Sequence, residues 1–142
     1  MTERMSEGDA KAKLGNLRAF AKDTNWEELG WQEYDNGARV ASFILGDPDD
    51  PDAPVIFTGV YPPGSRTAAH HHVNDYAEIL LEGSQQITNK WRHAGDVRIV
   101  KAGTGYGPLI AGPEGCRTLV IFRNQDWMSR GGRMNPVKPD VL

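Results

Sequence analysis

The feature that most constrains the fold is the regular return of turn-forming residues between short apolar runs. Glycine occurs 16 times and proline 9 times among the 142 residues. This weight of turn formers disfavours a helix bundle and favours short strands joined by tight turns. The runs that we expect to be strands are residues 39–45, 55–61, 77–82, 85–91, 97–100, 106–110 and 117–122. Strands spaced about ten residues apart are typical of a sandwich or a small barrel.

The segments between these runs carry the turn signals. Residues 46–54 are an acidic, proline-rich loop that cannot be helical. We expect further turns at residues 62–64, 82–83, 94–96, 103–105 and 112–115, each of which contains at least one glycine. Each of these turns is expected to end one strand and to start the next.

The two ends of the chain depart from the strand pattern. Apolar residues recur at helical spacing near the N-terminus, at Ala10, Leu14, Leu17 and Ala21. This spacing predicts one short amphipathic helix. After Phe122 the strand pattern fades, and we expect an extended arm. The predicted organisation is an N-terminal helical extension at residues 1–30, a barrel at 31–123 and a C-terminal arm at 124–142.

Composition and charge exclude several classes of function. The formal net charge of −3 offers no basic surface for a nucleic acid. No apolar run approaches the roughly 18 residues that a membrane span requires, and the N-terminus lacks the apolar stretch of a secretory signal. Cys116 is the only cysteine, so it forms no internal disulfide and is expected to be a small buried apolar residue. We therefore expect a soluble, cytoplasmic, single-domain protein.

Three of the four histidines are adjacent, at His70, His71 and His72. In an extended segment the side chains of His70 and His72 project to one face and that of His71 projects to the other. Two imidazoles on one face of a strand can bind one metal ion, and a following carboxylate would complete a set of two histidines and one carboxylate. A solvated loop is the alternative interpretation of this run.

The histidine run resembles the first motif of the cupins: a glycine, five residues, His-x-His, a later glutamate and a strand that ends in glycine. Gly64, His70, His72 and Gly83 match that spacing. The resemblance covers roughly residues 38–122. It implies an all-β fold, the double-stranded β-helix or jelly-roll barrel, to which the N-terminal helix would be appended.

A second stretch resembles the other cupin motif, which runs glycine, five residues, Pro-x-Gly, two residues and histidine. Gly95, Gly103 and Tyr106 match the positions of the two glycines and of the histidine, and Lys101 takes the place of the proline. Tyr106 thus stands where the family usually presents a third histidine ligand. A neutral phenol is a poor ligand until a metal lowers its pKa. Its expected role is that of a ligand, a proton donor or an aromatic lid.

The glutamate of the first motif is displaced. Its usual place is held by Tyr76, and Glu78 stands two residues later. A shift of two residues along a strand keeps the same face, so Glu78 is the expected anionic ligand. Asp75, in the preceding loop, is the reserve candidate. The alternative interpretation of Glu78 is an ion pair or hydrogen bond inside the barrel.

The resemblance implies a metal-binding protein with His70, His72 and Glu78 as ligands and Tyr106 as the catalytic residue. The expected cofactor is a divalent transition metal, namely iron, manganese, nickel, copper or zinc. The implied reaction is an oxygen-dependent dioxygenation, or an isomerase or lyase reaction, on a small organic molecule. The alternative is a cupin that binds a sugar or an organic acid without turnover. The expected assembly is a homodimer.

Overall fold

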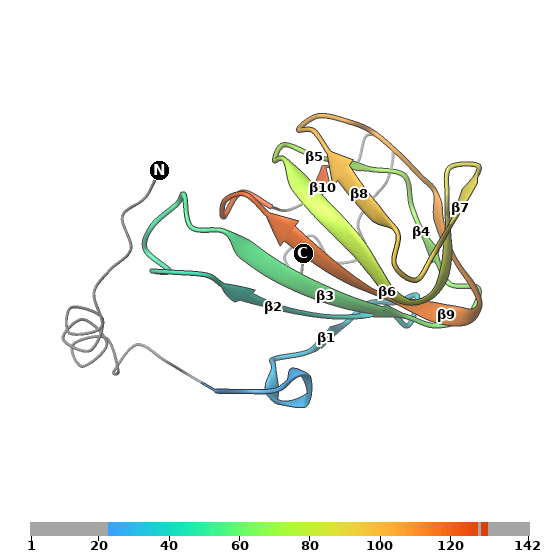
Figure 1. Cartoon of the computed structure of the whole chain (residues 1–142), viewed down its shortest axis with the longest axis horizontal. Helices are drawn as coiled ribbons and strands as arrows, with labels where there is room; N and C mark the ends of the chain where they lie inside the picture. Colours follow the sequence, from blue (N-terminus) through green and yellow to red (C-terminus); the bar gives the residue numbers. More distant parts are fainter. Residues whose placement is uncertain (1–22, 128, 131–142) are drawn as a thin grey trace, which may run out of the picture.

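The computed structural model describes residues 23–127 and 129–130 (Figure 1). The predicted N-terminal helix and residues 131–142 of the predicted arm lie outside the described residues. Within the described ranges the chain is almost entirely strand, and its one helical element is the 3-10 turn η2 at Trp26–Glu28. No helix in this part of the chain is long and apolar enough to span a membrane.

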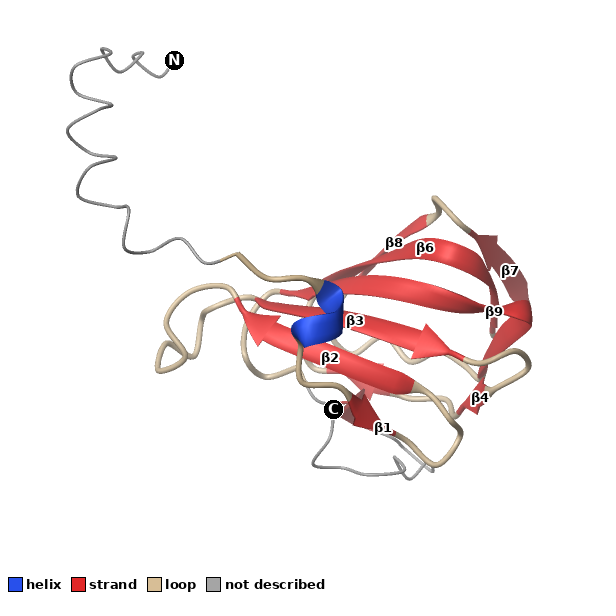
Figure 2. Cartoon of the chain, turned by 90° about the horizontal axis from the view of Figure 1, so that it is seen from below, coloured by secondary structure: helices blue, strands red, loops and turns tan. Residues whose placement is uncertain are grey.

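The strands form one antiparallel eight-stranded sheet and one two-stranded sheet. Figure 2 shows β2, β3, β9 and β6 side by side in a curved layer. The main path runs β1-β2-β3-β9-β6-β7, with β4 paired to β9 and β8 paired to β6, while β5 and β10 form the small sheet. The strands are β1 (Gln32–Glu33), β2 (Arg39–Ile44), β3 (Val55–Tyr61), β4 (Arg66–Thr67), β5 (His71–His72), β6 (Tyr76–Ile87), β7 (Lys90–His93), β8 (Val97–Val100), β9 (Leu109–Phe122) and β10 (Ser129–Arg130). The predicted all-β, jelly-roll class is confirmed.

Two of the predicted turns are wrong. Residues 82–83 lie inside β6 and residues 112–115 lie inside β9, so each of these strands replaces two predicted ones. The pairing of β6 with β9 shifts register between Leu80 and Glu82 and again between Gly83 and Gln85. Irregularities of this kind bend a strand without ending it. Both glycine-containing segments are therefore corners within continuous strands.

The core lies beneath the inner face of the large sheet. The buried apolar residues of its main cluster are Val40, Val55, Phe57, Tyr76, Val100, Val120 and Phe122. They alternate with more exposed residues along their strands, because successive side chains point to opposite faces. Tyr76 is 5% exposed and Phe122 is 3% exposed. These two rings pack with their centroids 5.0 Å apart, and both contact the ring of His72. The core therefore extends to the histidine run.

The described part of the C-terminal arm packs back on the barrel. The Gln125 side chain donates hydrogen bonds to the main-chain oxygens of Pro48 and Asp50. The ring of Trp127 contacts those of Phe57 and Phe122, with centroids 5.9 Å away in each case. Strand β10 then pairs with β5. The arm therefore covers the end of the barrel at which the histidines lie.

Candidate functional site

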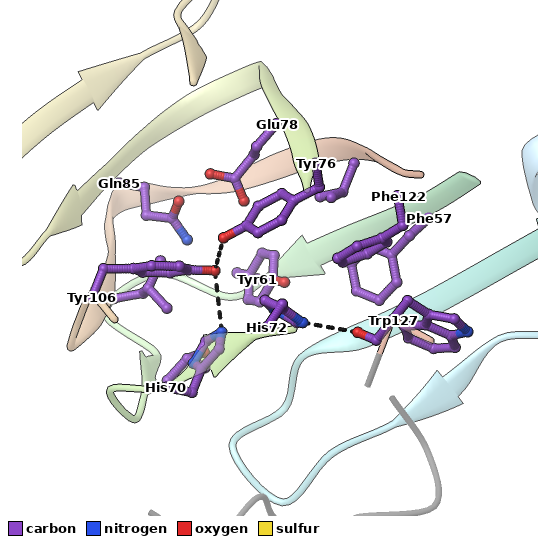
Figure 3. A pocket seen from close by; sticks show the side chains of 13 residues that line it. Phe57, Tyr61, His70, His72, Tyr76, Glu78, Gln85, Tyr106, Phe122 and Trp127 are labelled. Atoms are coloured by element: carbon purple, nitrogen blue, oxygen red, sulfur yellow. Dashed lines mark hydrogen bonds between the residues drawn. The ribbon is translucent and has the colours of Figure 1, made fainter. Parts of the chain in front are cut away.

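A cavity of about 70 Å³ opens at this end of the barrel (Figure 3). At roughly 10–15 Å³ for each water, it has room for about five water molecules or for a comparably small organic group. Its wall combines an aromatic part with a polar part. The lining residues are Phe57, Tyr61, Thr67, His70, His72, Tyr76, Glu78, Gln85, Tyr106, Leu109, Val120, Phe122 and Trp127.

The histidine run enters the cavity through a short strand. His70 forms a β-bridge with Tyr106, with a main-chain hydrogen bond of 3.0 Å in each direction, and His72 belongs to β5. His70 and His72 line the cavity, whereas His71 is not among the lining residues. The bridge between His70 and Tyr106 brings the two cupin-like motifs together, although 36 residues separate these positions.

Main-chain carbonyls orient both imidazoles of the cavity. Nδ1 of His70 lies 2.8 Å from the oxygen of Ala68, and Nδ1 of His72 lies 2.8 Å from the oxygen of Trp127. A carbonyl only accepts hydrogen bonds, so Nδ1 carries the proton and, in the neutral ring, Nε2 carries the lone pair. Burial lowers the pKa of His70 and favours its neutral form. Metal-binding histidines are oriented in this way by an N–H···O=C hydrogen bond.

Two phenols extend this polar cluster. The hydroxyl of Tyr76 donates a hydrogen bond to the hydroxyl of Tyr106, which lies 3.3 Å from Nε2 of His70. Since Nε2 is the accepting nitrogen of that ring, the Tyr106 hydroxyl donates to it. Burial raises the pKa of both phenols, and the neighbouring Tyr76 and Glu78 add to the effect at Tyr106. The phenols are therefore neutral as long as no cation approaches them.

The carboxylate of Glu78 forms a buried ion pair. Its Oε1 lies 3.3 Å from a guanidinium nitrogen of Arg98, and the two side chains are 13% and 14% exposed. Burial raises the pKa of Glu78, and Arg98 opposes this shift. The guanidinium of Arg98 also lies over the ring of Tyr106, 4.5 Å from its centroid. The ion pair thus positions one of the two phenols.

The structure brings all four predicted site residues to one cavity but does not bring Glu78 into a ligand cluster with the histidines. No group of three or more His, Cys, Asp and Glu side chains in the described ranges is arranged to hold a metal ion. The reserve candidate Asp75 does not line the cavity. Its carboxylate accepts hydrogen bonds from the Ala102 main chain and from Arg123. The two oriented imidazoles fit a metal ion, and Glu78 as a further ligand stays a prediction.

Similar folds occur among solved structures. The polyketide cyclase RemF from Streptomyces resistomycificus superposes with a TM-score of 0.66 over 82% of this chain and 89% of that one, at 19% identity. An RmlC-like cupin from Shewanella frigidimarina gives a TM-score of 0.61 over 74% and 92%, at 16% identity. The chain has the cupin fold. KdgF from Halomonas sp. gives a TM-score of 0.58 over 75% and 96%, at 16% identity.

At these identities the similarity concerns the cupin fold and not a particular activity. No protein-family model and no curated protein matches the sequence. The chemistry of this cupin barrel therefore has to be inferred from its own side chains.

Three residues of the cupin cavity were not identified as functional from the sequence. Tyr76 stands in the glutamate position of the motif, and that position is the signal that could have placed it inside. Gln85 is 3% exposed, and its Oε1 has no hydrogen-bond partner; a lone glutamine on a strand carries no such signal. Trp127 reaches the cavity from the C-terminal arm, and nothing in the local sequence indicates that the arm folds back.

Proposed function

We propose that this chain binds a divalent transition metal through Nε2 of His70 and Nε2 of His72 and acts on a small organic molecule in the adjoining cavity. The observation that carries the proposal is the pair of Nδ1–H···O=C hydrogen bonds, which turn the lone pair of each imidazole away from the main chain. Iron, manganese, nickel, copper and zinc all accept imidazole ligands. The bound metal supplies Lewis acidity and open coordination positions, which suit an oxygen-dependent dioxygenation.

The side chains of the cavity contribute binding and exclusion of water. Phe57, Phe122 and Trp127 form an apolar wall against which a flat organic group can pack. The hydroxyl of Tyr106 lies 3.3 Å from Nε2 of His70, so it contacts whatever binds at that nitrogen. Tyr106 is therefore the catalytic residue of the proposal. Arg98, which lies over its ring, is a positioning residue.

Binding without turnover is the second candidate function, and one observation favours it. The buried Oε1 of Gln85 lacks a hydrogen-bond partner, and a hydroxyl group of a sugar or of a hydroxylated organic acid would donate to it. A metal-dependent isomerase or lyase reaction is the third candidate, and its substrate would bind in the same cavity. Oxygen uptake with small phenols, diketones and thiols separates the dioxygenase from the other two candidates.

The proposal is tested by the metal content of the purified protein. Elemental analysis is expected to find a transition metal in the parent protein. His72→Ala removes one of the two ligands and is expected to lose that metal. His71→Ala is the matched control, since the neighbouring imidazole does not line the cavity, and it is expected to keep the metal. If the two variants bind the same amount of metal, the assignment of His72 is wrong.

A further inference from the structure

Four aromatic side chains, those of His70, His72, Tyr76 and Tyr106, are arranged in a closed circle at the polar end of the cavity (Figure 3). We call this arrangement the ring of four. The ring centroids of His70 and His72 lie 5.1 Å apart, and those of His72 and Tyr76 also lie 5.1 Å apart. The centroids of Tyr76 and Tyr106 are separated by 6.4 Å, and those of Tyr106 and His70 by 5.0 Å. Each of the four side chains thus contacts two others of the set.

The donor atoms of this ring converge. The hydroxyl oxygens of Tyr76 and Tyr106 are hydrogen-bonded to one another, and the second lies 3.3 Å from Nε2 of His70. Two phenol oxygens and one imidazole nitrogen therefore meet at one point. The ring of His72 contacts those of His70 and Tyr76, and its Nδ1 is held by the carbonyl of Trp127. All four donors belong to side chains that line the same cavity.

The four side chains are also held in place. Tyr76 is 5% exposed and begins β6, where it is paired with Val100 on β8 and with Phe122 on β9. Tyr106 is held by its main-chain bridge to His70 and by Arg98, which lies over its ring. Fixing the ligands in advance lowers the cost of binding an ion. The carboxylate that would otherwise compete, that of Glu78, is paired with Arg98.

The chemistry of this donor set selects the ion. A cation that binds a phenol oxygen displaces the phenol proton to solvent, as it does for a coordinating thiol or water. The resulting phenolates are hard, anionic oxygen donors, and they favour a small ion of high charge. Two phenolates and two neutral imidazoles leave a trivalent ion with a single positive charge. The guanidinium of Arg98 over the Tyr106 ring stabilises the negative charge of that phenolate.

We propose that Tyr76 and Tyr106, together with His70 and His72, form a two-imidazole, two-phenolate site for ferric iron. The inference rests on the proposed function, since it takes His70 and His72 as the metal-binding pair. It identifies the metal and replaces the expected carboxylate ligand by two phenolates. In this site both tyrosines lose their hydroxyl protons to solvent when iron binds. Their mutual hydrogen bond, and the one from Tyr106 to Nε2 of His70, are exchanged for iron–oxygen and iron–nitrogen bonds.

The test uses the full chain and iron alone. Metal is removed with a chelator, Fe(II) is added anaerobically, and air is then admitted to oxidise it. A phenolate bound to ferric iron gives a visible charge-transfer band and tyrosinate vibrations in the resonance Raman spectrum. Both signals are expected here. Bound iron without either signal overturns the phenolate ligands while leaving the histidine pair intact.

Substitution of each tyrosine shows which residue gives rise to the charge-transfer band. Tyr76→Phe and Tyr106→Phe are each expected to lower the absorbance per bound iron by roughly half, because one of two phenolates is lost, and the double variant is expected to be colourless. Tyr61→Phe is the matched control, since Tyr61 is another phenol that lines the cavity but stands outside the ring of four. An unchanged band in the double variant overturns the inference. Should a variant fail to fold, the Raman signal of the parent protein still decides the matter. Retention of metal by His72→Ala contradicts the proposed function instead.

Discussion

Arg98 links the charged and aromatic parts of the cavity at the scale of single residues. It is the direct cross-strand partner of Glu78 in the pairing of β6 with β8. Opposite charges at such positions attract. Because both are buried, removal of either one would leave the other as an uncompensated charge. The same guanidinium lies over Tyr106. One antiparallel register therefore neutralises a buried carboxylate and fixes a phenol.

Exchanging Glu78 for glutamine tests this role. The variant removes one charge of a buried pair and leaves Arg98 without its counter-ion, which typically costs about 3–5 kcal/mol of folding free energy. We expect a fall of this order in a urea titration, with little loss of metal. Asp75→Asn is the control, because that carboxylate pairs with Arg123 on the surface, where ion pairs contribute little. Loss of metal in Glu78→Gln would make Glu78 a ligand, and its loss in Asp75→Asn would transfer that role to the loop.

Cys116 is expected to be inert in the folded protein. It is 6% exposed, and burial raises the pKa of its thiol to about 12. Only the thiolate reacts with alkylating reagents, so at pH 8 the folded protein should react on the order of a thousandfold more slowly than an ordinary thiol of pKa about 8.5. The rate of iodoacetamide labelling measures this, with the urea-unfolded chain as reference. Similar rates in both states would contradict the burial.

At the scale of strands, the sequence predicted the short elements better than the long ones. The predicted runs at 55–61 and 97–100 coincide with β3 and β8 because turn signals bound them on both sides. Glycine within β6 and β9 has the same local appearance as a turn. Its effect depends on the partner strand, since an added Cβ at Gly83 would lie 2.0 Å from the carbonyl oxygen of Gly115.

Alanine at Gly83 is expected to disrupt this corner. Gly83 has φ +76°, and the new Cβ would collide with backbone atoms of β9, which cannot rotate away. Gly95→Ala is the matched control, because Gly95 has φ +94° but no atom within 4 Å of an added Cβ. In the control, only the strain of an alanine in the left-handed region should lower the folding free energy, by about 1–2 kcal/mol. A urea titration should show a clearly larger loss of folding free energy for Gly83→Ala than for Gly95→Ala. Equal losses would mean that the strands move apart at Gly83 without a loss of stability.

The candidate site was only partly predictable for a related reason. Alternation along a strand placed His70 and His72 together, and motif spacing brought in Tyr106. The partners that orient these residues come from elements that are distant in sequence. The carbonyl that accepts from His72 belongs to Trp127, 55 residues later, and the partner of Glu78 follows from the register of β6 and β8. Neither the fold-back nor the register is encoded in a local pattern.

Trp127→Ala tests the fold-back of the arm. The ring of Trp127 packs on Phe57 and Phe122 and thereby holds the carbonyl that orients His72. Loss of such an orienting partner typically lowers metal affinity 10–100-fold, and we expect a decrease of that order in a competition titration with a chelator. Trp91→Ala is the control, because Trp91 lies on β7, outside the cavity, and is 45% exposed. Equal affinities in the two variants would separate the arm from the site.

At the scale of the whole molecule, the outer face of the sheet carries an apolar row. The strand registers align Phe43, Ile56, Ile121, Ala77 and Ile99 across β2, β3, β9, β6 and β8. Phe43 is 41% exposed, Ile121 is 38% exposed and Ile99 is 85% exposed. We expect an exposed apolar row of this kind to be an interaction site.

A second copy of the chain is the occupant that we expect on this face. The row crosses five strands about 4.8 Å apart, so it is some 19 Å wide, and Val97, at 59% exposure, extends it along β8. A two-fold axis in the plane of this face brings the apolar row of one copy against the same row of the other, as an isologous interface requires. The homodimer stays a prediction, and this face is where we expect it to form.

Ile99→Lys places a charge at the most exposed position of the row and is expected to convert the dimer into a monomer. Lysine is common on edge strands and keeps a long apolar stem, so the fold should persist. Sedimentation velocity over a range of concentrations measures the mass of the particle. Val73→Lys is the control, since Val73 is 43% exposed but lies in the loop between β5 and β6. A lysine that a second copy would bury without a counter-ion opposes association, whereas a lysine that stays exposed does not. The masses of the two variants should therefore differ only if a second copy covers this face. A parent protein that is monomeric at every concentration, or a dimeric Ile99→Lys variant, would exclude this interface.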